Sequence, residues 1–359
     1  MVLVIACPCA LVISTPLTIA SAITSAARHG VLIKGGIYLE QLADVDAIAF
    51  DKTGTLTEGR LTVVEVIPMN SLSKQEIVKF AAAVELRSEH HLAEALLNHA
   101  EKEGIGIEDV VVEHFESLPG RGVRARINHT YFSLGNHQLA EELNVCSPQV
   151  EQMLTAIESK GQTGVIISNE KEVLGIISVV DKVRMESKAA LGHLHELGVR
   201  ETMLLTGDNE AAAQHVGKEL GFDTVKAELL PGQKLAALKE LKTRRATVCM
   251  IGDGVNDAPA LALADIGVAM GGIGSDSALE TADVVLMTDD LSKVPFAVRL
   301  GKKALAVIRQ NIALSITTKL VFLGLGAFGI TSLWLAILAD DGVALAVVLN
   351  GLRLLRRTK

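Results

Sequence analysis

Long apolar stretches near both ends of the chain contrast with the mixed apolar and charged pattern between them. Residues 1–23 are apolar and almost uncharged, and residues 312–349 contain only Lys319, Asp340 and Asp341 as charged side chains. A membrane-spanning helix needs about 20 predominantly apolar residues. The first stretch therefore predicts one membrane helix, and the longer second stretch predicts two.

Basic residues beside these stretches predict which side of a membrane they face. Arg28 and Lys34 follow the first stretch, and clusters of basic residues lie before and after the second. These clusters are Arg299, Lys302, Lys303 and Arg309 before it, and Arg353, Arg356, Arg357 and Lys359 after it. Because cytoplasmic loops are rich in Lys and Arg, we expect residues 25–305 to form one cytosolic unit of a multi-pass plasma-membrane protein. A signal peptide would begin with basic residues, which residues 1–24 lack.

Three apolar runs in the cytosolic region each lead into a carboxylate. The runs are residues 47–50, 203–205 and 248–251, and the carboxylates beyond them are Asp51, Asp208 and Asp253. Buried parallel strands read as such runs, and their carboxyl ends meet at one crevice of a doubly wound sheet. Clustered carboxylates require a cation, so the pattern predicts Mg²⁺ beside a phosphoryl group. Small hydroxyl and glycine residues follow Asp51, and their backbone N–H groups suit covalent phosphoryl transfer.

Three motifs resemble the P-type ATPases in order and spacing. The phosphorylation loop, the TGD loop and the GDGxND hinge of that family match Asp51-Lys52-Thr53-Gly54-Thr55, Thr206-Gly207-Asp208 and Gly252-Asp253-Gly254-Val255-Asn256-Asp257. The resemblance implies an α/β fold with membrane helices, in which a haloacid-dehalogenase-like doubly wound phosphorylation domain carries an inserted α+β nucleotide-binding domain. It further implies that Asp51 attacks the γ-phosphoryl group of ATP.

The same resemblance assigns roles around Asp51. Mg²⁺ is then held by Asp51, Asp253 and the carbonyl of Thr53. A lysine beside the acyl phosphate offsets charge on the transferring oxygens, and this position corresponds to Lys234, which follows Pro231-Gly232. The implied catalytic residues are Asp51, Lys52, Thr53, Thr206, Asp208, Lys234, Asp253, Asn256 and Asp257.

More than a hundred residues separate Asp51 from the predicted return strand at residues 173–180, and we expect an inserted domain there. In the heavy-metal (type IB) P-type ATPases, the nucleotide-binding domain carries a Glu, a Ser-Glu-His-Pro loop, a Gly-x-Gly and a Gly-Asn pair in this succession. The resemblance implies that ATP contacts the matching residues, which are Glu85, His90, Gly120, Gly122, Gly135 and Asn136. His91 stands in place of the proline, and this change should loosen the loop that positions His90.

Cys7-Pro8-Cys9 lies within the first apolar stretch. Proline opens a membrane helix, and two flanking thiolates are soft ligands for Zn²⁺, Cd²⁺, Pb²⁺ or Cu⁺. This motif resembles the hallmark of the type IB pumps. Their zinc, cadmium and lead branch also carries a lysine in the penultimate helix and Asp-x-Gly in the last. The implied site for the transported ion consists of Cys7, Cys9, Lys319 and Asp340, with Asp341 as an additional carboxylate.

Composition limits the partners. A length of 359 residues with 49% hydrophobic residues and a mean hydropathy of +0.36 is unusual for one soluble domain. The net charge of −8 argues against nucleic acid as a partner. Four cysteines without regular spacing do not form a disulfide framework, and Cys146 and Cys249 are expected to pack as small hydrophobes. The expected partners are ATP, the transported ion and the lipid bilayer.

The predicted domains follow from these motifs. They are a membrane helix at 1–24, a split phosphorylation domain at 25–60 and 173–305, a nucleotide-binding domain at 61–172, two membrane helices at 306–352 and a basic cytoplasmic tail at 353–359. The family's actuator motif Thr-Gly-Glu does not occur in the sequence. We therefore expect the chain to correspond to the C-terminal half of a pump, with the N-terminal half as its partner.

The leading hypothesis is ATP-driven export of Zn²⁺, Cd²⁺ or Pb²⁺ through an aspartyl-phosphate intermediate. A second hypothesis is a copper-exporting pump, although the Asn-Tyr-Asn and Met-x-x-Ser-Ser motifs of those pumps do not occur. A third is a phosphatase of the haloacid-dehalogenase class, and a fourth is a fragment that cannot transport. Such phosphatases place a second Asp two residues after the nucleophile as a general acid, and Thr53 holds that position here.

Overall fold

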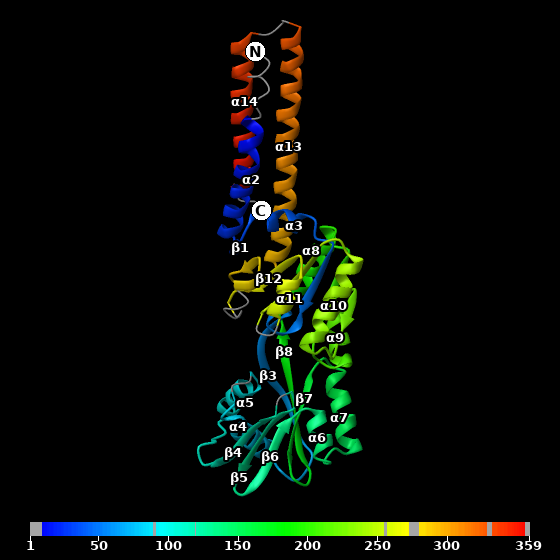
Figure 1. Cartoon of the computed structure of the whole chain (residues 1–359). Helices are drawn as coiled ribbons and strands as arrows, with labels where there is room; N and C mark the ends of the chain where they lie inside the picture. Colours follow the sequence, from blue (N-terminus) through cyan, green and yellow to red (C-terminus); the bar gives the residue numbers. More distant parts are fainter. Residues whose placement is uncertain are drawn as a thin grey trace. The chain divides into compact units, whose positions relative to one another are not determined.

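The computed structural model describes residues 9–88, 91–118, 120–254, 257–272, 280–328 and 332–355. It consists of two compact units (Figure 1). The first unit comprises residues 1–51, 186–203 and 231–359, and the second comprises residues 52–185 and 204–230.

A seven-stranded sheet carries the predicted carboxylate-terminated strands. Its order is β1 (Val31–Ile33), β13 (Val284–Leu286), β12 (Ile266–Met270), β11 (Val248–Gly252), β2 (Ala47–Asp51), β9 (Glu201–Leu205) and β10 (Thr224–Lys226). β11 pairs in parallel with both β2 and β12, whereas β1 joins the edge antiparallel. Every residue of β2, β9, β11 and β12 is buried, which explains why their sequences are mostly apolar. The doubly wound α/β sheet is as predicted.

Helices connect these strands. They are α3 (Gly36–Ala43), α8 (Ser187–Glu196), α9 (Glu210–Leu220), α10 (Pro231–Arg244) and α11 (Ala258–Leu263). α9 shows how local sequence sets the bounds. The side chain of Asn209 accepts a hydrogen bond from the N–H of Ala212 at its start, and Gly221 in a left-handed conformation ends it. The cap fixes the chain immediately after Asp208.

The second unit contains an antiparallel sheet of six strands. Its order is β3 (Thr57–Pro68), β8 (Val173–Val183), β7 (Thr163–Asn169), β6 (Thr130–Gly135), β5 (Gly122–Ile127) and β4 (Val112–Leu118). The α-helices described between β3 and β8 are α4 (Lys74–Glu85), α5 (His91–Lys102), α6 (His137–Glu142) and α7 (Pro148–Glu158). The sheet takes in residues 57 to 183 and so extends beyond the predicted insertion at 61–172, because β3 and β8 form one long antiparallel pair.

Alternating side chains of the sheet pack into two separate hydrophobic clusters. Val165 and Ile167 of β7 pack in a cluster with residues of α4 and α5. Ile166, between them, packs with Leu154 and Ile157 of α7 in another cluster. Successive residues of a strand point to opposite faces, so helices cover both faces of this sheet. The inserted α+β domain therefore has its own hydrophobic core.

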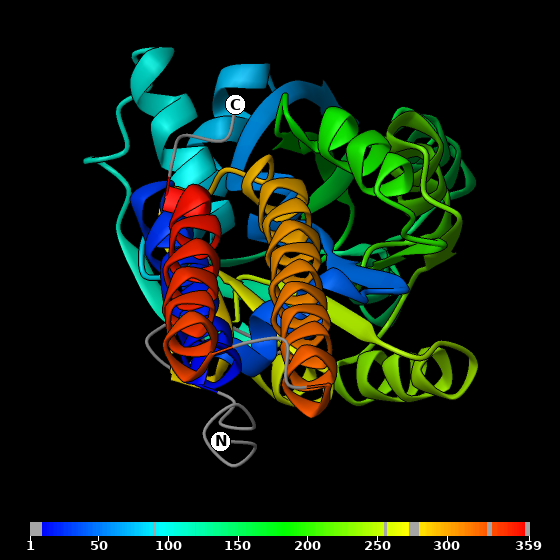
Figure 2. The same ribbon diagram turned by 90° about the horizontal axis from the view of Figure 1, so that it is seen from above.

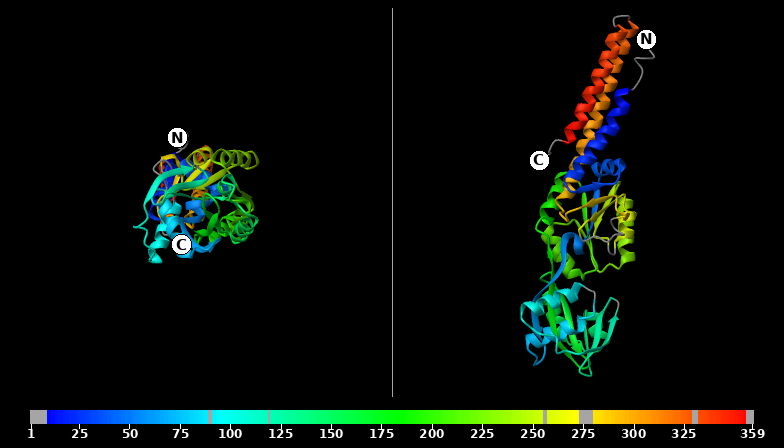
Figure 3. Two further views of the ribbon diagram at one scale, coloured as in Figure 1. Left: turned by 90° about the horizontal axis from the view of Figure 1, so that it is seen from below. Right: turned by 90° about the vertical axis from the view of Figure 1, so that its left-hand side faces the viewer.

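Three long helices of the first unit pack along one another: α2 (Cys9–Arg28), α13 (Lys293–Ala327) and α14 (Leu333–Leu352). Figure 2 shows α13 and α14 end-on, and Figure 3 shows all three side by side. Within the described residues, two spans are long and apolar enough to cross a membrane, Ala10–Arg28 and Lys293–Ala327. Exposed apolar side chains on these helices, among them Val12, Leu320 and Leu345, suit contact with lipid.

α13 is one continuous helix of 35 residues and passes through the predicted domain boundary at residues 305 and 306. Its first half is buried at positions such as Val298, Ala304 and Ile308. Its later half joins α14 through polar groups. Asn311 donates a hydrogen bond to the carbonyl of Val347 at 3.3 Å, and Asn350 donates to Asn311 at 2.8 Å. One helix thus connects the sheet of this unit with the apolar helices.

Candidate active site

Asp51 is the last residue of β2, and its side chain is almost completely buried. Nζ of Lys234 lies 2.5 Å from Oδ1 of Asp51 and 3.0 Å from Oδ1 of Asp257. Lys234 comes from the first turns of α10, and Asp257 stands directly before α11. Lys234 and Asp51 are 183 residues apart in the sequence and meet in one buried cluster of charges. The predicted proximity of Lys234 to Asp51 is found in the structure.

The electrostatics of this cluster follow from its burial. Burial, and then the neighbouring carboxylate of Asp257, raise the pKa of Asp51 to about 7, although Lys234 opposes the rise. Burial disfavours the charged form of Lys234 as well, but the carboxylates of Asp51 and Asp257 outweigh it and raise the lysine pKa. Asp253, beyond the end of β11, also raises the pKa of Asp51. Excess negative charge at this sheet edge favours a cation.

The loop after Asp51 is held in place by residues of the second unit. Gly54 adopts a positive φ of 72°, which glycine tolerates, and its N–H donates to Oγ1 of Thr57 at 3.2 Å. Thr57 in turn donates to Oδ2 of Asp181 at 2.6 Å. Arg184 donates to the carbonyls of Thr55 at 3.1 Å and Gly54 at 3.3 Å. The loop is thus a preorganised turn.

Sequence reasoning assigned no role to Thr57, Asp181 or Arg184. Asp181 and Arg184 directly follow the apolar run 173–180, and this position is the signal that could have identified them. Lys52 forms an ion pair with Asp208, and the N–H of Asp208 donates to Oγ1 of Thr206 at 3.1 Å. Thr206 therefore orients the turn that carries Asp208. Asn256 lies outside the described residues.

The predicted nucleotide residues of the second unit fall into two groups. Glu85 ends α4 and is 2% exposed, and its Oε2 has no hydrogen-bond partner among the described residues. Burial raises the pKa of this carboxyl group, while Ser88 opposes the rise through a hydrogen bond. His90 lies outside the described residues, and the side chain of His91 is not described. A buried carboxyl group with an unpartnered oxygen is costly, which makes Glu85 a candidate for a ligand contact.

Gly120, Gly122, Gly135 and Asn136 meet where β5 and β6 pair. Asn136 donates a hydrogen bond to the carbonyl of Gly120 at 3.0 Å and caps α6 through the N–H of Leu139. Gly122 pairs with Gly135 in the β5–β6 ladder. A Cβ on Gly122, whose φ is +146°, would lie 2.1 Å from the carbonyl oxygen of Leu134, and one on Gly135 would lie 2.2 Å from that of Arg121. The close approach of β5 and β6 is therefore sufficient to explain why both positions are glycine.

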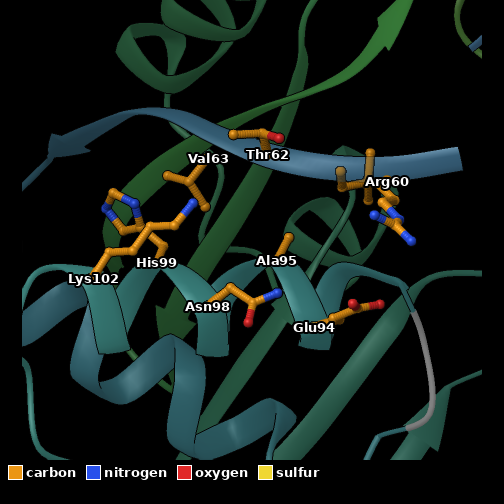
Figure 4. A pocket seen from close by; sticks show the side chains of 9 residues that line it. Arg60, Thr62, Val63, Glu94, Ala95, Asn98, His99 and Lys102 are labelled. Carbon is orange, nitrogen blue, oxygen red and sulfur yellow. The ribbon is translucent and has the colours of Figure 1, made fainter. Parts of the chain in front are cut away.

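The second unit also contains a cleft of about 190 Å³ between α5 and β3 (Figure 4). Its lining includes polar and basic side chains from both elements, and these are Arg60, Glu94, Asn98, His99 and Lys102. Of the predicted nucleotide residues that the structure describes, none lines this cleft. The cleft is therefore a surface separate from the loop of Gly120 and Asn136.

The predicted ion site of the membrane helices is described in part. Nζ of Lys319 lies 3.1 Å from Oδ1 of Asp340, and this pair links α13 with α14. Both side chains are about one quarter exposed, at 22% and 31%. Cys7 lies outside the described residues, and Cys9 begins α2 although its side chain is not described. The predicted proximity of Lys319 and Asp340 is found in the structure.

Comparison with known proteins identifies the family of this fold and site. Residues 45–265 match the family of haloacid dehalogenase-like hydrolases. A probable cadmium-transporting ATPase of Alkalihalophilus pseudofirmus is 48% identical over 358 residues, which cover 99% of this chain and 50% of that protein. The chain thus spans about half the length of this curated relative.

Two solved structures extend the comparison. The crystal structure of a zinc-transporting PIB-type ATPase in the E2.Pi state is 41% identical, with a TM-score of 0.81 over 98% of this chain and 57% of that one. The catalytic domain of the CPx-ATPase CopB-B, solved to follow conformational changes upon nucleotide binding, is 28% identical, with a TM-score of 0.62 over 77% of this chain and 98% of that one. The predicted fold class is confirmed. The chain belongs to the haloacid dehalogenase-like hydrolases, and over 99% of its length its close relatives are P-type ATPases named for cadmium and zinc transport.

Proposed function

We propose that this chain is the catalytic portion of a pump that exports Zn²⁺, Cd²⁺ or Pb²⁺ with energy from ATP, and that Asp51 is its phosphorylated nucleophile. The observation that carries the proposal is the buried contact of Asp51 with Lys234 at the end of β2, 2.5 Å between charged atoms. Transport is proposed for a pump that combines this chain with the segments forming the other half of its relatives.

In the proposed step, a carboxylate oxygen of Asp51 forms a bond to the γ-phosphorus of ATP while the bond from that phosphorus to the β–γ bridging oxygen breaks. ADP leaves with the electron pair, and an acyl phosphate remains on Asp51. Lys234 favours the ionised form of Asp51, in opposition to the effect of burial, and offsets the charge of the transferring oxygens. Asp257 holds Lys234 from its other side, so the ammonium group is positioned before ATP binds.

The residues around Asp51 fit Mg²⁺. Carboxylate and carbonyl oxygens are the hard ligands that this ion prefers, and the clustered carboxylates of Asp51, Asp253 and Asp257 carry more negative charge than Lys234 neutralises. Asp51, Asp253 and the Thr53 carbonyl would hold the ion. When bound, Mg²⁺ neutralises charge on the phosphoryl group.

The structure also bears on the phosphatase hypothesis. Thr53 occupies the position two residues after Asp51, and its side chain is exposed. A threonine hydroxyl is a poor general acid or base at neutral pH. The acyl phosphate on Asp51 should therefore persist, as a pump requires and as a phosphatase does not.

We further propose that ATP binds in the second unit at Glu85, His90, Gly120, Gly122, Gly135 and Asn136. The buried, unpartnered Oε2 of Glu85 and the loop fixed by Asn136 support this placement. The backbone N–H and C=O groups of the glycine-rich turn remain the candidate contacts, since the glycines themselves are required by strand packing.

The transported ion is assigned to Cys7, Cys9 and Asp340. Two soft thiolates and one hard carboxylate suit a borderline divalent ion, whereas Cu⁺ would gain little from the carboxylate. Lys319, in contact with Asp340, can neutralise this carboxylate when the ion is absent. We place the pump in the plasma membrane with its catalytic units in the cytoplasm, in line with the basic residues beside the apolar helices.

Labelling with ATP tests the catalytic proposal. The purified full chain is incubated with γ-labelled ATP and Mg²⁺, quenched in acid and then treated with hydroxylamine, which cleaves acyl phosphates. We expect hydroxylamine-sensitive label that disappears in Asp51→Asn. Asp46 directly precedes the first residue of β2, whereas Asp51 is the last. Asp46→Asn is therefore the matched control, and this variant should still be labelled. Label that survives Asp51→Asn or resists hydroxylamine would overturn the assignment.

A further inference from the structure

A side-chain cluster in the second unit has the composition of a metal site. One ligand atom each from His137, Cys146 and Glu151 lies within 4.8 Å of the other two. The cluster occupies the corner between α6 and α7, and it shares no residue with the proposed sites around Asp51 and Asp340. It contains no residue of the cleft between α5 and β3.

Two capped helices bring the three residues together. Asn136 caps α6, so His137 is its first residue. Ser147 caps α7, which begins at Pro148 and places Glu151 in its first turn. Between the helices, Asn144 adopts a positive φ of 55° and turns the chain back. Short segments with fixed ends therefore hold the ligands.

Apolar packing anchors the thiol. Val145 and Cys146 pack against a buried cluster that includes Val150, Leu154 and Ile157. This packing limits the movement of Cys146, and it leaves the side chain partly exposed. A thiol held at the edge of a core and open to solvent on one side is accessible to an ion.

The imidazole lacks a partner for its inward nitrogen. Nε2 of His137 is buried and has no hydrogen-bond partner among the described residues. Oε1 of Glu141 lies 3.9 Å from Nε2 of His137, which is beyond hydrogen-bonding distance. A buried polar nitrogen normally has a hydrogen-bond partner. The unpartnered Nε2 of His137 is therefore available to coordinate a metal ion.

We propose that His137, Cys146 and Glu151 bind one Zn²⁺ or Cd²⁺ ion, with Glu141 supplying a further carboxylate. A thiolate, an imidazole and carboxylates form the donor set of tetrahedral zinc sites, and the thiolate favours Cd²⁺ equally. Ligand atoms bound to one such ion lie about 3–4 Å apart, as follows from metal–ligand distances of about 2.0–2.3 Å. The three ligand atoms already lie within 4.8 Å of one another, and Glu151 is exposed, so its side chain has room to move closer to an ion.

The position of the site gives it a structural consequence. His137 directly follows Asn136, whose amide donates to the carbonyl of Gly120. An ion that ties α6 to the start of α7 would hold Asn136 beside this turn. The metal site itself does not depend on the proposed ATP contacts.

Cadmium spectroscopy tests the site. The full chain is prepared with Cys7→Ala and Cys9→Ala, which removes the thiolates of the proposed transport site, and is titrated with Cd²⁺ while the ultraviolet thiolate-to-cadmium band is recorded. We expect one equivalent of Cd²⁺ to saturate the band. Cys146→Ser should abolish it, and His137→Ala and Glu151→Gln should each weaken binding at least tenfold.

Matched controls separate this site from other ligands. Cys249→Ser removes the buried cysteine of β11, and His99→Ala removes a histidine of the cleft between α5 and β3, so both should bind Cd²⁺ like the parent. Calorimetry with Zn²⁺ should rank the parent and its variants in the same order of affinity as the titration with Cd²⁺. A band that persists in Cys146→Ser, or the absence of any band at one equivalent of Cd²⁺, would overturn the proposal.

Discussion

At the scale of single residues, the charges around Asp51 govern the proposed chemistry. Lys234 offsets part of the effect of burial on the pKa of Asp51, and both Asp51 and Asp257 lie within ion-pair distance of Lys234. The sequence pattern predicted Asp51 because a carboxylate follows an apolar run, and the family resemblance predicted Lys234. The contact of Lys234 with Asp257 was not predicted, because it depends on how α10 and α11 approach the strand ends. Periodicity along a chain does not contain that information.

We predict that Lys234→Met slows phosphorylation of Asp51 by about 10²–10³-fold, because removal of one preorganised charge at a transferring group typically costs this much. The rate of acyl-phosphate formation in rapid-quench experiments measures the effect. Lys242→Met, on the same helix but paired with Asp265, is the matched control. Equal rates in the two variants would show that Lys234 has only a structural role.

Glu85 gives a prediction about pH. Burial raises the pKa of its carboxyl group, so the folded state binds this proton more tightly than the unfolded chain does. The free energy of unfolding therefore decreases as the pH rises from the ordinary carboxyl pKa through the raised value. We expect Glu85→Gln to raise the melting temperature at pH 7 and to leave it nearly unchanged at pH 4, as followed by circular dichroism.

The same variant should bind ATP about tenfold more weakly, a loss of about 1.4 kcal/mol, if Glu85 contacts the nucleotide. Calorimetry with ATP measures this. Glu94→Gln, in the cleft between α5 and β3, should bind ATP normally. A destabilised Glu85→Gln variant at pH 7 would contradict the claim that burial of this carboxyl group is costly.

At the scale of helices and strands, glycine shows where sequence interpretation and structure differ. Gly120 and Gly122 were predicted from the family resemblance as residues that contact ATP. The structure provides another cause for Gly122, since its missing Cβ leaves room for the carbonyl of Leu134. Strand pairing brings residues 122 and 134 together, and no local signal in the sequence indicates it. The sequence also did not predict that α13 is one continuous helix. Its first half carries charged residues and its second half is mostly apolar, so the two halves were assigned to different domains.

We predict that Gly122→Ala destabilises the second unit by about 3 kcal/mol, because its Cβ would overlap a backbone carbonyl at a φ that side chains rarely adopt. Gly120→Ala should cost only about 1 kcal/mol, since its Cβ meets no atom within 4 Å. Hydrogen exchange of the β5 and β6 amides measures both. Similar protection in the two variants would contradict the packing argument.

At the scale of the whole molecule, the chain combines a catalytic fold with helices suited to a membrane. The relatives named for cadmium and zinc transport cover almost all of it. The fold could be predicted because carboxylate-terminated strands and long apolar segments are strong signals. The hydrogen bonds that Asp181 and Arg184 make with Thr57 and Thr55 could not be predicted, since these residues meet only through tertiary structure.

For a pump rebuilt with the N-terminal half of its relatives, we predict ATPase activity that rises with Zn²⁺, Cd²⁺ or Pb²⁺. Asp340→Ala should reduce this stimulation at least tenfold, because it removes the proposed hard ligand, which contacts Lys319. Asp341→Ala, one residue further along α14 and exposed, is the matched control and should retain most of it. Stimulation by Cu⁺ without stimulation by Zn²⁺ would instead support a copper pump.

The most direct test of the central claim is the chemical identification of the phosphorylated residue. The full chain is phosphorylated with ATP and Mg²⁺, treated with borohydride, which reduces an aspartyl phosphate to homoserine, and mapped by peptide mass spectrometry. We predict homoserine at position 51 in the wild type after a short reaction with ATP. After the same reaction time, Lys234→Met should contain homoserine at no position. Homoserine at another aspartate, or phosphate on a residue other than Asp51, would contradict the assignment of Asp51 as the nucleophile.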